Sequence, residues 1–203
     1  IQKVWRGERP QEGRFREFTQ ADVDVVAAGE LPFHYEVELP LVMADALGRL
    51  REVGLPPVLI QVNNRKVVEG FYRGIGLQDV PAVLRTVDKL DKVGPDAVAE
   101  LLARDADATP GQAKACLELA SITGEDASVA ERVAALGAEH PLLTEGLDEL
   151  VRVVEAAAEH APGVLRADLR IARGLDYYTG TVYETVLQGH EDLGSVCSGG
   201  RYD

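Results

Sequence analysis

Cysteine and clustered histidine are scarce in this sequence, and their scarcity excludes several kinds of site. The 203 residues contain only two cysteines, Cys116 and Cys197, which lie far apart and belong to no C-x-x-C pair. A disulfide framework or a structural zinc site is therefore not expected, and a reducing cytoplasm fits best. The four histidines show neither H-E-x-x-H nor H-x-x-E-H spacing, so we expect no catalytic metal centre.

Long apolar runs and aromatic residues are also lacking. No apolar stretch approaches the roughly 20 residues that span a bilayer, which excludes a membrane-spanning protein. Aromatic residues make up only 5%, but 46% hydrophobic and 27% charged residues are the balance of a globular chain that buries a core. The sequence begins at Ile1 with neither Met nor a signal-peptide core, so we expect a trimmed chain.

Negative charge is abundant, at −13 overall, and the positive charge is unevenly placed. Residues 1–16 carry a net charge of +3, whereas the other 187 residues carry −16. A basic island on an acidic chain predicts a local anion site and not a general nucleic-acid surface. The alternative is a solvated hairpin tip that is rich in surface arginines.

Hydrophobic periodicity predicts strand-rich ends and a helical middle. Residues 3–26 read as a β-hairpin whose turn lies at 10–13. A helix is expected between Pro40 and Gly54, and residues 58–62 read as a buried strand.

The middle of the chain is predicted to be helical throughout, from residue 66 to about 162, and short strands return after it. This order predicts an α+β fold with an antiparallel or mixed sheet, flanking helices and a helical insertion. We therefore divide the chain into the first part of a sheet domain (1–65), a helical insertion region (66–162) and the second part of the sheet domain (163–203).

The returning strand of the hairpin has an unusual polar face. Alternation along the strand places on that face Arg16, Phe18, Gln20, Asp22 and Asp24. The opposite, ordinary packing face is expected to hold Phe15, Thr19, Ala21, Val23 and Val25. A polar face in the middle of a long strand suits the floor of a pocket.

Arg6, Glu8 and Arg14 are candidates for an anion site on this hairpin. A guanidinium forks onto phosphate oxygens, so two arginines across a turn can converge on a polyanion. Glu8 would neutralise one arginine or accept a hydrogen bond from a ligand amine. Phe18 could stack on a purine ring, although a single phenylalanine more often belongs to a core.

A second candidate cluster spans residues 173–180 and reads Arg-Gly-Leu-Asp-Tyr-Tyr-Thr-Gly. Tyr177 and Tyr178 must face opposite ways if the chain is extended, so one can pack while the other offers a hydroxyl to a pocket. The alternative is a turn at the entry of a strand with one half-buried tyrosine. Gly199 and Gly200 form either a plain turn or a floor where the backbone approaches a substrate.

Three segments resemble the histidyl-tRNA synthetases, a family of class II aminoacyl-tRNA synthetases. Residues 5–24, which begin Trp-Arg-Gly-Glu-Arg-Pro, resemble the family's motif 2, and residues 173–183 resemble its histidine-specific signature. Residues 195–203 resemble the glycine-rich stretch that leads toward motif 3. The resemblance covers the chain end to end and is loosest at about 105–160. It implies a class II synthetase-like sheet, with the two sheet parts forming the catalytic domain.

The resemblance also implies roles for the residues that match motif 2. Arg6 would hold the α-phosphate of ATP and the carboxylate of the amino acid, Glu8 would face the adenine side and Arg14 the outer phosphates. Phe18 would stack on adenine. Next to them, Gln20 and Asp24 would receive histidine, with Asp24 on the imidazole or the ammonium. Many family members have the longer Glu at that last position.

The two later segments would complete the histidine pocket. Tyr177, Tyr178 and Tyr202 would line the imidazole, above a floor that includes Gly199 and Gly200. By the same resemblance, the catalytic residues would be Arg173 and Arg6, both at the α-phosphate.

The implied activity is that of a histidine–tRNA ligase. L-histidine would be activated by ATP to histidyl-adenylate and transferred to the 3′ end of its tRNA, with Mg²⁺ bound mainly through the ATP phosphates. The resemblance further implies a cytoplasmic homodimer. Motif 1, motif 3 and the anticodon-binding domain would lie outside residues 1–203, so we expect the chain to be a core that does not aminoacylate alone.

Two other functions stay open on the sequence. One is the synthetase-like regulatory subunit of ATP phosphoribosyltransferase, which senses histidine without charging tRNA. The other is a structural or nucleic-acid-binding paralogue. The phosphate-handling Arg6, Arg14 and Arg173 favour the enzyme, because a sensor need not keep them.

Overall fold

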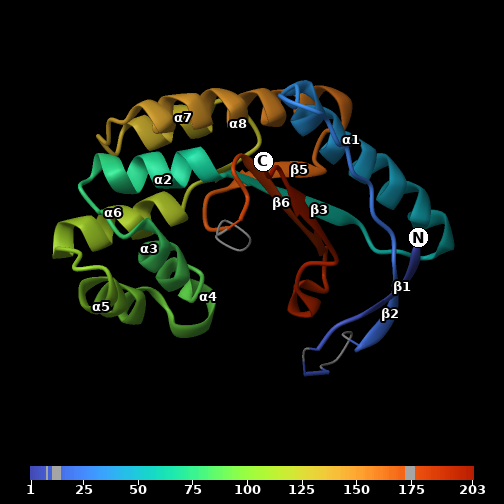
Figure 1. Ribbon diagram of the computed structural model, residues 1–203, viewed down its shortest axis with the longest axis horizontal. Helices are drawn as coiled ribbons and strands as arrows, with labels where there is room; N and C mark the ends of the chain where they lie inside the picture. The colour runs from blue at the N-terminus through green and yellow to red at the C-terminus, as the bar shows by residue number, and fades with distance from the viewer. Residues whose placement is uncertain (8, 11–14, 172–176) are drawn as a thin grey trace.

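The computed structural model describes residues 1–7, 9–10, 15–171 and 177–203 (Figure 1). The strands, in chain order, are β1 (Gln2–Trp5), β2 (Glu17–Gln20), β3 (Val58–Asn64), β4 (Thr123–Gly124), β5 (Leu165–Asp168), β6 (Thr181–Leu187) and β7 (Cys197–Gly200). The α-helices are α1 (His34–Arg49), α2 (Arg65–Gly74), α3 (Val80–Val87), α4 (Leu90–Val93), α5 (Pro95–Asp105), α6 (Pro110–Ala120), α7 (Ser128–Ala134) and α8 (Pro141–His160). Two short 3₁₀ helices are η1 (Leu50–Val53) and η2 (Glu191–Leu193).

A five-stranded mixed sheet has the strand order β4-β5-β3-β6-β7. The central strand β3 pairs in parallel with β5 and antiparallel with β6. Its residues are almost entirely buried, as the apolar run at 58–62 predicts. The return of strands after the helical middle is also confirmed, because β5 begins at Leu165. The α+β class with a mixed sheet and flanking helices is therefore confirmed.

The hairpin forms as predicted, but its second strand is shorter. β1 and β2 pair antiparallel, with Val4 opposite Phe18 and Gln2 opposite Gln20. The strand predicted to continue to residue 26 is wrong, because β2 ends at Gln20, where its pairing with β1 also ends. The hairpin stands at one side of the molecule (Figure 1), and no described residue before position 36 is buried.

The expected packing face of the hairpin is also wrong. Phe15 is 69% exposed and Val23 is 55% exposed, so neither belongs to a core within this chain. Alternation alone identifies which side chains share a face, but it does not supply the layer that would cover them.

Helix α1 begins earlier than the sequence predicts. It starts at His34 and contains Pro40, which the sequence treats as a breaker in front of the helix. A proline inside a helix removes one backbone hydrogen bond, and here the buried ring of Pro40 contributes to packing instead. The expected stop is confirmed: Gly54 follows η1 with a left-handed φ of 98°.

The middle of the chain is helical except for β4, so the expectation of helix throughout is wrong at residues 123–124, which pair with β5 at the edge of the sheet. A single buried cluster joins the helical region to the sheet, with Leu102 and Leu150 in the same core as Ile60. Helices α2 and α8 lie side by side (Figure 1) and approach closely at glycines. A Cβ on Gly70 would lie 2.3 Å from the backbone nitrogen of Leu143.

Candidate functional site

Three tyrosines form a cluster beside the β6–β7 edge of the sheet. The ring centroids of Tyr177 and Tyr178 are 4.4 Å apart, and those of Tyr178 and Tyr202 are 6.4 Å apart. Tyr178 is half-buried, whereas Tyr177 and Tyr202 are each 64% exposed. The opposite facing of the adjacent tyrosines was expected only for an extended chain, and Tyr177 lies in a turn. The structure matches the alternative, a turn at the entry of a strand with one half-buried tyrosine, Tyr178. We call these three residues the tyrosine cluster.

Gly200 provides the surface on which Tyr178 rests. Gly199 and Gly200 belong to β7 and pair with β6, so the reading of a plain turn is wrong. A Cβ on Gly200 would lie 2.8 Å from the ring of Tyr178 and 2.7 Å from the carbonyl oxygen of Thr181. A Cβ on Gly199 would meet nothing within 4 Å. Glycine at position 200 is therefore what lets the Tyr178 ring lie against the strand.

The hydroxyl of Tyr178 stays protonated at neutral pH. Its pKa is raised, first by burial and then by the neighbouring Tyr177 and Tyr202. A neutral phenol can both donate and accept a hydrogen bond. This chemistry suits either nitrogen of a neutral imidazole ring.

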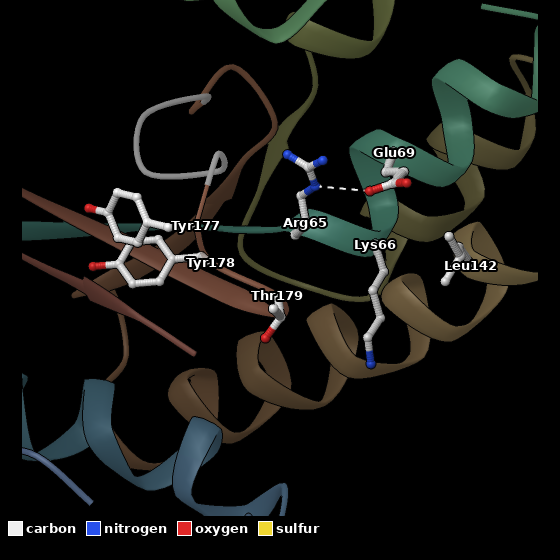
Figure 2. Close-up of a pocket in the computed structure, with 7 residues that line it drawn as sticks. All are labelled: Arg65, Lys66, Glu69, Leu142, Tyr177, Tyr178 and Thr179. Carbon is white, nitrogen blue, oxygen red and sulfur yellow. Dashed lines mark hydrogen bonds and ion pairs between the residues drawn. The ribbon is translucent and has the colours of Figure 1, made fainter. Parts of the chain in front are cut away.

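A cavity of about 310 Å³ opens beside the tyrosine cluster (Figure 2). Its walls come from the start of α2, the start of α8 and the segment before β6. The lining residues are Arg65, Lys66, Glu69, Leu142, Tyr177, Tyr178 and Thr179. This volume is at the small end of the range typical for sites of small molecules. The cavity therefore has room for a metabolite of about the size of an amino acid.

Charged residues on the α2 side of the cavity are held in place by ion pairs. Asn64 caps α2 by accepting from the backbone nitrogen of Lys66 at 2.8 Å. The Lys66 ammonium lies 2.8 Å from Glu145 and 2.5 Å from Glu149 on α8. Burial would lower the pKa of Lys66, but these two carboxylates raise it overall, so the ammonium stays charged.

Glu69 is paired in the same way on the next turn of α2. Arg65 Nε donates to Glu69 at 3.0 Å (Figure 2), and Arg73 Nε donates to its other oxygen at 2.9 Å. Burial would raise the pKa of Glu69, but the two arginines lower it overall. The sequence reasoning did not assign Arg65 or Lys66 to a pocket. Both residues follow β3 directly, but β3 extends two residues beyond the strand predicted at 58–62.

The hairpin brings together three of the residues that the sequence singles out. The Arg6 guanidinium lies 5.0 Å from the centre of the Phe18 ring, a cation–π distance. Arg6 Nη2 donates to Gln20 Oε1 at 3.2 Å, and Gln20 Nε2 donates to Asp22 Oδ1 at 2.6 Å. The shared face of Phe18 and Gln20 is therefore confirmed. Asp24 lies beyond β2 and is exposed.

Three predicted site residues, Glu8, Arg14 and Arg173, lie outside the described residues. The segment between β2 and α1 lies close to β7 and to the residue that follows it. Burial and then the charge of Asp22 raise the pKa of the Cys197 thiol in β7. Arg201 Nη1, one residue past β7, donates to the Leu31 carbonyl at 3.1 Å.

A buried ion pair near the tyrosine cluster was not expected from the sequence. Glu36 in the first turn of α1 is 4% exposed and lies 2.8 Å from Arg201.

Within the part of the chain that is described, no group of three or more His, Cys, Asp or Glu side chains is placed to hold a metal ion. Nor is any described helix both long and apolar enough to span a bilayer.

Comparison with known proteins gives a consistent result. The family model described as histidyl-tRNA synthetase matches residues 1–203. A curated relative from Micrococcus luteus, named histidine–tRNA ligase, is 63% identical over 203 residues, which are 100% of this chain and 44% of that protein. The chain thus spans less than half the length of the curated relatives that it matches.

Solved structures give the same match at the level of the fold. The crystal structure of histidyl-tRNA synthetase from Nostoc sp. PCC 7120 is similar with a TM-score of 0.87 and 33% identity, over 100% of this chain and 46% of that chain. An ATP phosphoribosyltransferase regulatory subunit/histidyl-tRNA synthetase from Bacillus halodurans C has a TM-score of 0.69 at 21% identity, over 86% of this chain and 44% of that chain. At that identity, the second match shows the fold alone.

Proposed function

Since the chain belongs to the histidyl-tRNA synthetase family, we propose that it supplies the core of a histidine–tRNA ligase that binds histidine and ATP. The observation that carries this proposal is the tyrosine cluster, in which Tyr178 rests on Gly200 and Tyr177 and Tyr178 line a cavity of about 310 Å³. By the whole protein we mean a chain of the relatives' length that contains these 203 residues.

The imidazole of histidine is the group that the tyrosine cluster suits. A site that hydrogen-bonds a polar group rejects analogues that lack the group, because its own buried donors and acceptors are then left unpaired. The protonated hydroxyl of Tyr178, which points away from Arg65 and Lys66 (Figure 2), would supply one such partner, and the Tyr177 and Tyr202 rings would supply apolar walls. On this proposal Gly199 forms part of the floor, since the space above it is open.

The hairpin suits ATP and the carboxylate of the amino acid. Arg6 carries a guanidinium that can fork onto phosphate or carboxylate oxygens, and Phe18 offers a ring face to a purine. Gln20 already accepts from Arg6, so it holds that guanidinium toward the same face of the hairpin. Mg²⁺ would be bound mainly through the phosphates of ATP.

The activation step needs no side-chain base, because the attacking carboxylate carries no proton. A carboxylate oxygen of histidine attacks the α-phosphorus of ATP, pyrophosphate leaves, and the product is histidyl-adenylate. A ribose hydroxyl at the 3′ end of the tRNA then attacks the acyl carbon, its proton passes to a phosphate oxygen of the adenylate, and AMP leaves. Fixed positive charge at the phosphates lowers the barrier of the first step, a role we assign to Arg6. From the resemblance alone, Arg173 would share this role at the α-phosphate and Arg14 at the outer phosphates, whereas Glu8 would face the adenine side. A cytoplasmic homodimer belongs to the same proposal.

The main alternative is a histidine-sensing regulatory subunit with the same fold. The similarity to a regulatory-subunit structure is at 21% identity, whereas the identity to the Micrococcus luteus ligase is 63%. The higher identity supports the ligase.

Charging of histidine tRNA by the whole protein tests the proposal. Arg6→Ala should lower the rate by about 100-fold or more, since removing one transition-state donor typically costs that much. Arg85→Ala is the matched control, because Arg85 is exposed on α3, outside the site. Full activity of the Arg6 variant would contradict the assignment.

A further inference from the structure

Glu36 is a buried carboxylate whose two oxygens are both occupied by donors from the β6–β7 edge. Its Oε1 accepts from Arg201 Nη1 at 2.8 Å. Its Oε2 accepts from the backbone nitrogen of Thr181 at 3.0 Å and from the Thr181 hydroxyl at 2.5 Å. The Tyr183 hydroxyl donates to the backbone carbonyl of Glu36 as well. A carboxylate that is 4% exposed is tolerated only when its oxygens are satisfied in this way.

These contacts fix the two backbone segments that hold the tyrosine cluster. The Arg201 nitrogen donates to the Thr181 carbonyl at 2.9 Å, and the Thr179 nitrogen donates to the Arg201 carbonyl at 2.8 Å. The first of these segments is residues 179–181, which Tyr178 directly precedes. The second contains Arg201, which Gly200 directly precedes. Glu36 therefore binds Thr181, three residues after Tyr178, and Arg201, one residue after Gly200.

The neighbouring glycine fits the same arrangement. A Cβ on Gly180 would lie 3.0 Å from Glu36 Oε2 and 3.1 Å from Arg201 Cδ. The chain can pass this close to the ion pair because position 180 has no side chain. Glu36 itself is not among the residues that line the cavity.

We propose that Glu36 is a positioning residue for histidine binding, which acts through Arg201 and Thr181 on the place of Tyr178 and does not touch the substrate. The inference rests on the proposed function, because it assigns the tyrosine cluster to the imidazole. It extends that function to a residue of α1, which is far in sequence from either strand.

Replacement of Glu36 by glutamine isolates the carboxylate. Glutamine has the same length, but it has one acceptor oxygen and an amide that only donates. If the oxygen faces Thr181, the amide opposes the Arg201 guanidinium; if the oxygen faces Arg201, Thr181 loses its acceptor. Glu36→Asp keeps both acceptors and withdraws them by one methylene, so its effect should be intermediate.

The measurement is pyrophosphate exchange by the whole protein, with KM determined separately for histidine and ATP. Glu36→Gln should raise KM for histidine about tenfold or more, as expected for the loss of a charged hydrogen bond, and should change KM for ATP by less than about threefold. The double variant Glu36→Gln/Arg201→Gln should be less impaired than the product of the single effects, since the two residues act as a pair.

Val133→Ala controls for simple loss of stability. Val133 is fully buried in α7, away from the site, so the variant should lower the unfolding temperature and leave KM for histidine unchanged. A Glu36→Gln protein with the KM for histidine of the unsubstituted protein would overturn the inference. Equal rises in both KM values would also overturn it. Absence of exchange in the unsubstituted protein would instead refute the proposed function.

Discussion

A methyl group added at Gly200 should cost stability, whereas one added at the adjacent Gly199 should not. The Cβ of Gly200→Ala would lie 2.7 Å from the Thr181 carbonyl oxygen and 2.8 Å from the Tyr178 ring, against 3.4–4 Å for ordinary contact. The neighbours must therefore move by about 0.6 Å or more, and one of them is sheet backbone that cannot move alone. Overpacking of this kind typically costs about 1–3 kcal/mol.

Thermal unfolding of the 203-residue chain measures the difference. For a chain of this length the cost corresponds to a drop of about 2–12 °C in Tm for Gly200→Ala. Gly199→Ala is the matched control, since it lies on the same strand and its Cβ would meet nothing within 4 Å, and its Tm should stay within about 2 °C. Equal Tm values for the two variants would refute the contact between Gly200 and Tyr178.

Three further predictions concern the rest of the fold. Gly146→Ala should destabilise by about 1–3 kcal/mol because its Cβ would lie 2.6 Å from backbone of α2, whereas Gly48→Ala, with open space in α1, should be neutral or stabilising in urea unfolding. Asp168→Asn should cost about 1–3 kcal/mol in the same assay, since a fully buried carboxylate that accepts from Gln61 at 2.8 Å gains a donor where an acceptor is needed; an unchanged midpoint would contradict this. Burial raises the pKa of Cys116 from 9.0 to about 12, so this thiol should resist alkylation at pH 8 unless the chain unfolds. Above about pH 9 the unfolded chain loses the thiol proton and the folded chain keeps it, so the free energy of unfolding should be lower at pH 10 than at pH 8 in urea unfolding.

Short-range pattern was enough to predict much of the fold. The apolar run at 58–62 correctly gave β3, because burial on both faces leaves a signature in consecutive residues. The return of strands after the helical middle was also predicted, and β5 begins at Leu165. The helical middle was predicted from the helical spacing of its apolar residues. The error at β4 results from its length, since two residues carry no period and their pairing with β5 depends on tertiary contact.

The site was predictable only in part, for a similar reason. Alternation placed Phe18 and Gln20 on one face, and the hairpin brought Arg6 to them. The Glu36–Arg201 pair joins residues 165 positions apart, and a glutamate in the first turn of an amphipathic helix carries no sign that it will be buried. The alternation of residues 16–24 likewise did not show that pairing with β1 ends at Gln20.

Histidine-dependent exchange between ATP and pyrophosphate by the whole protein tests the central claim most directly. With the amino acids supplied one at a time, we expect exchange with histidine alone, and we expect it to be lost in Arg173→Ala. Exchange with another amino acid, or binding of histidine without any exchange, would contradict the account. The second of these outcomes would assign the chain to the regulatory class.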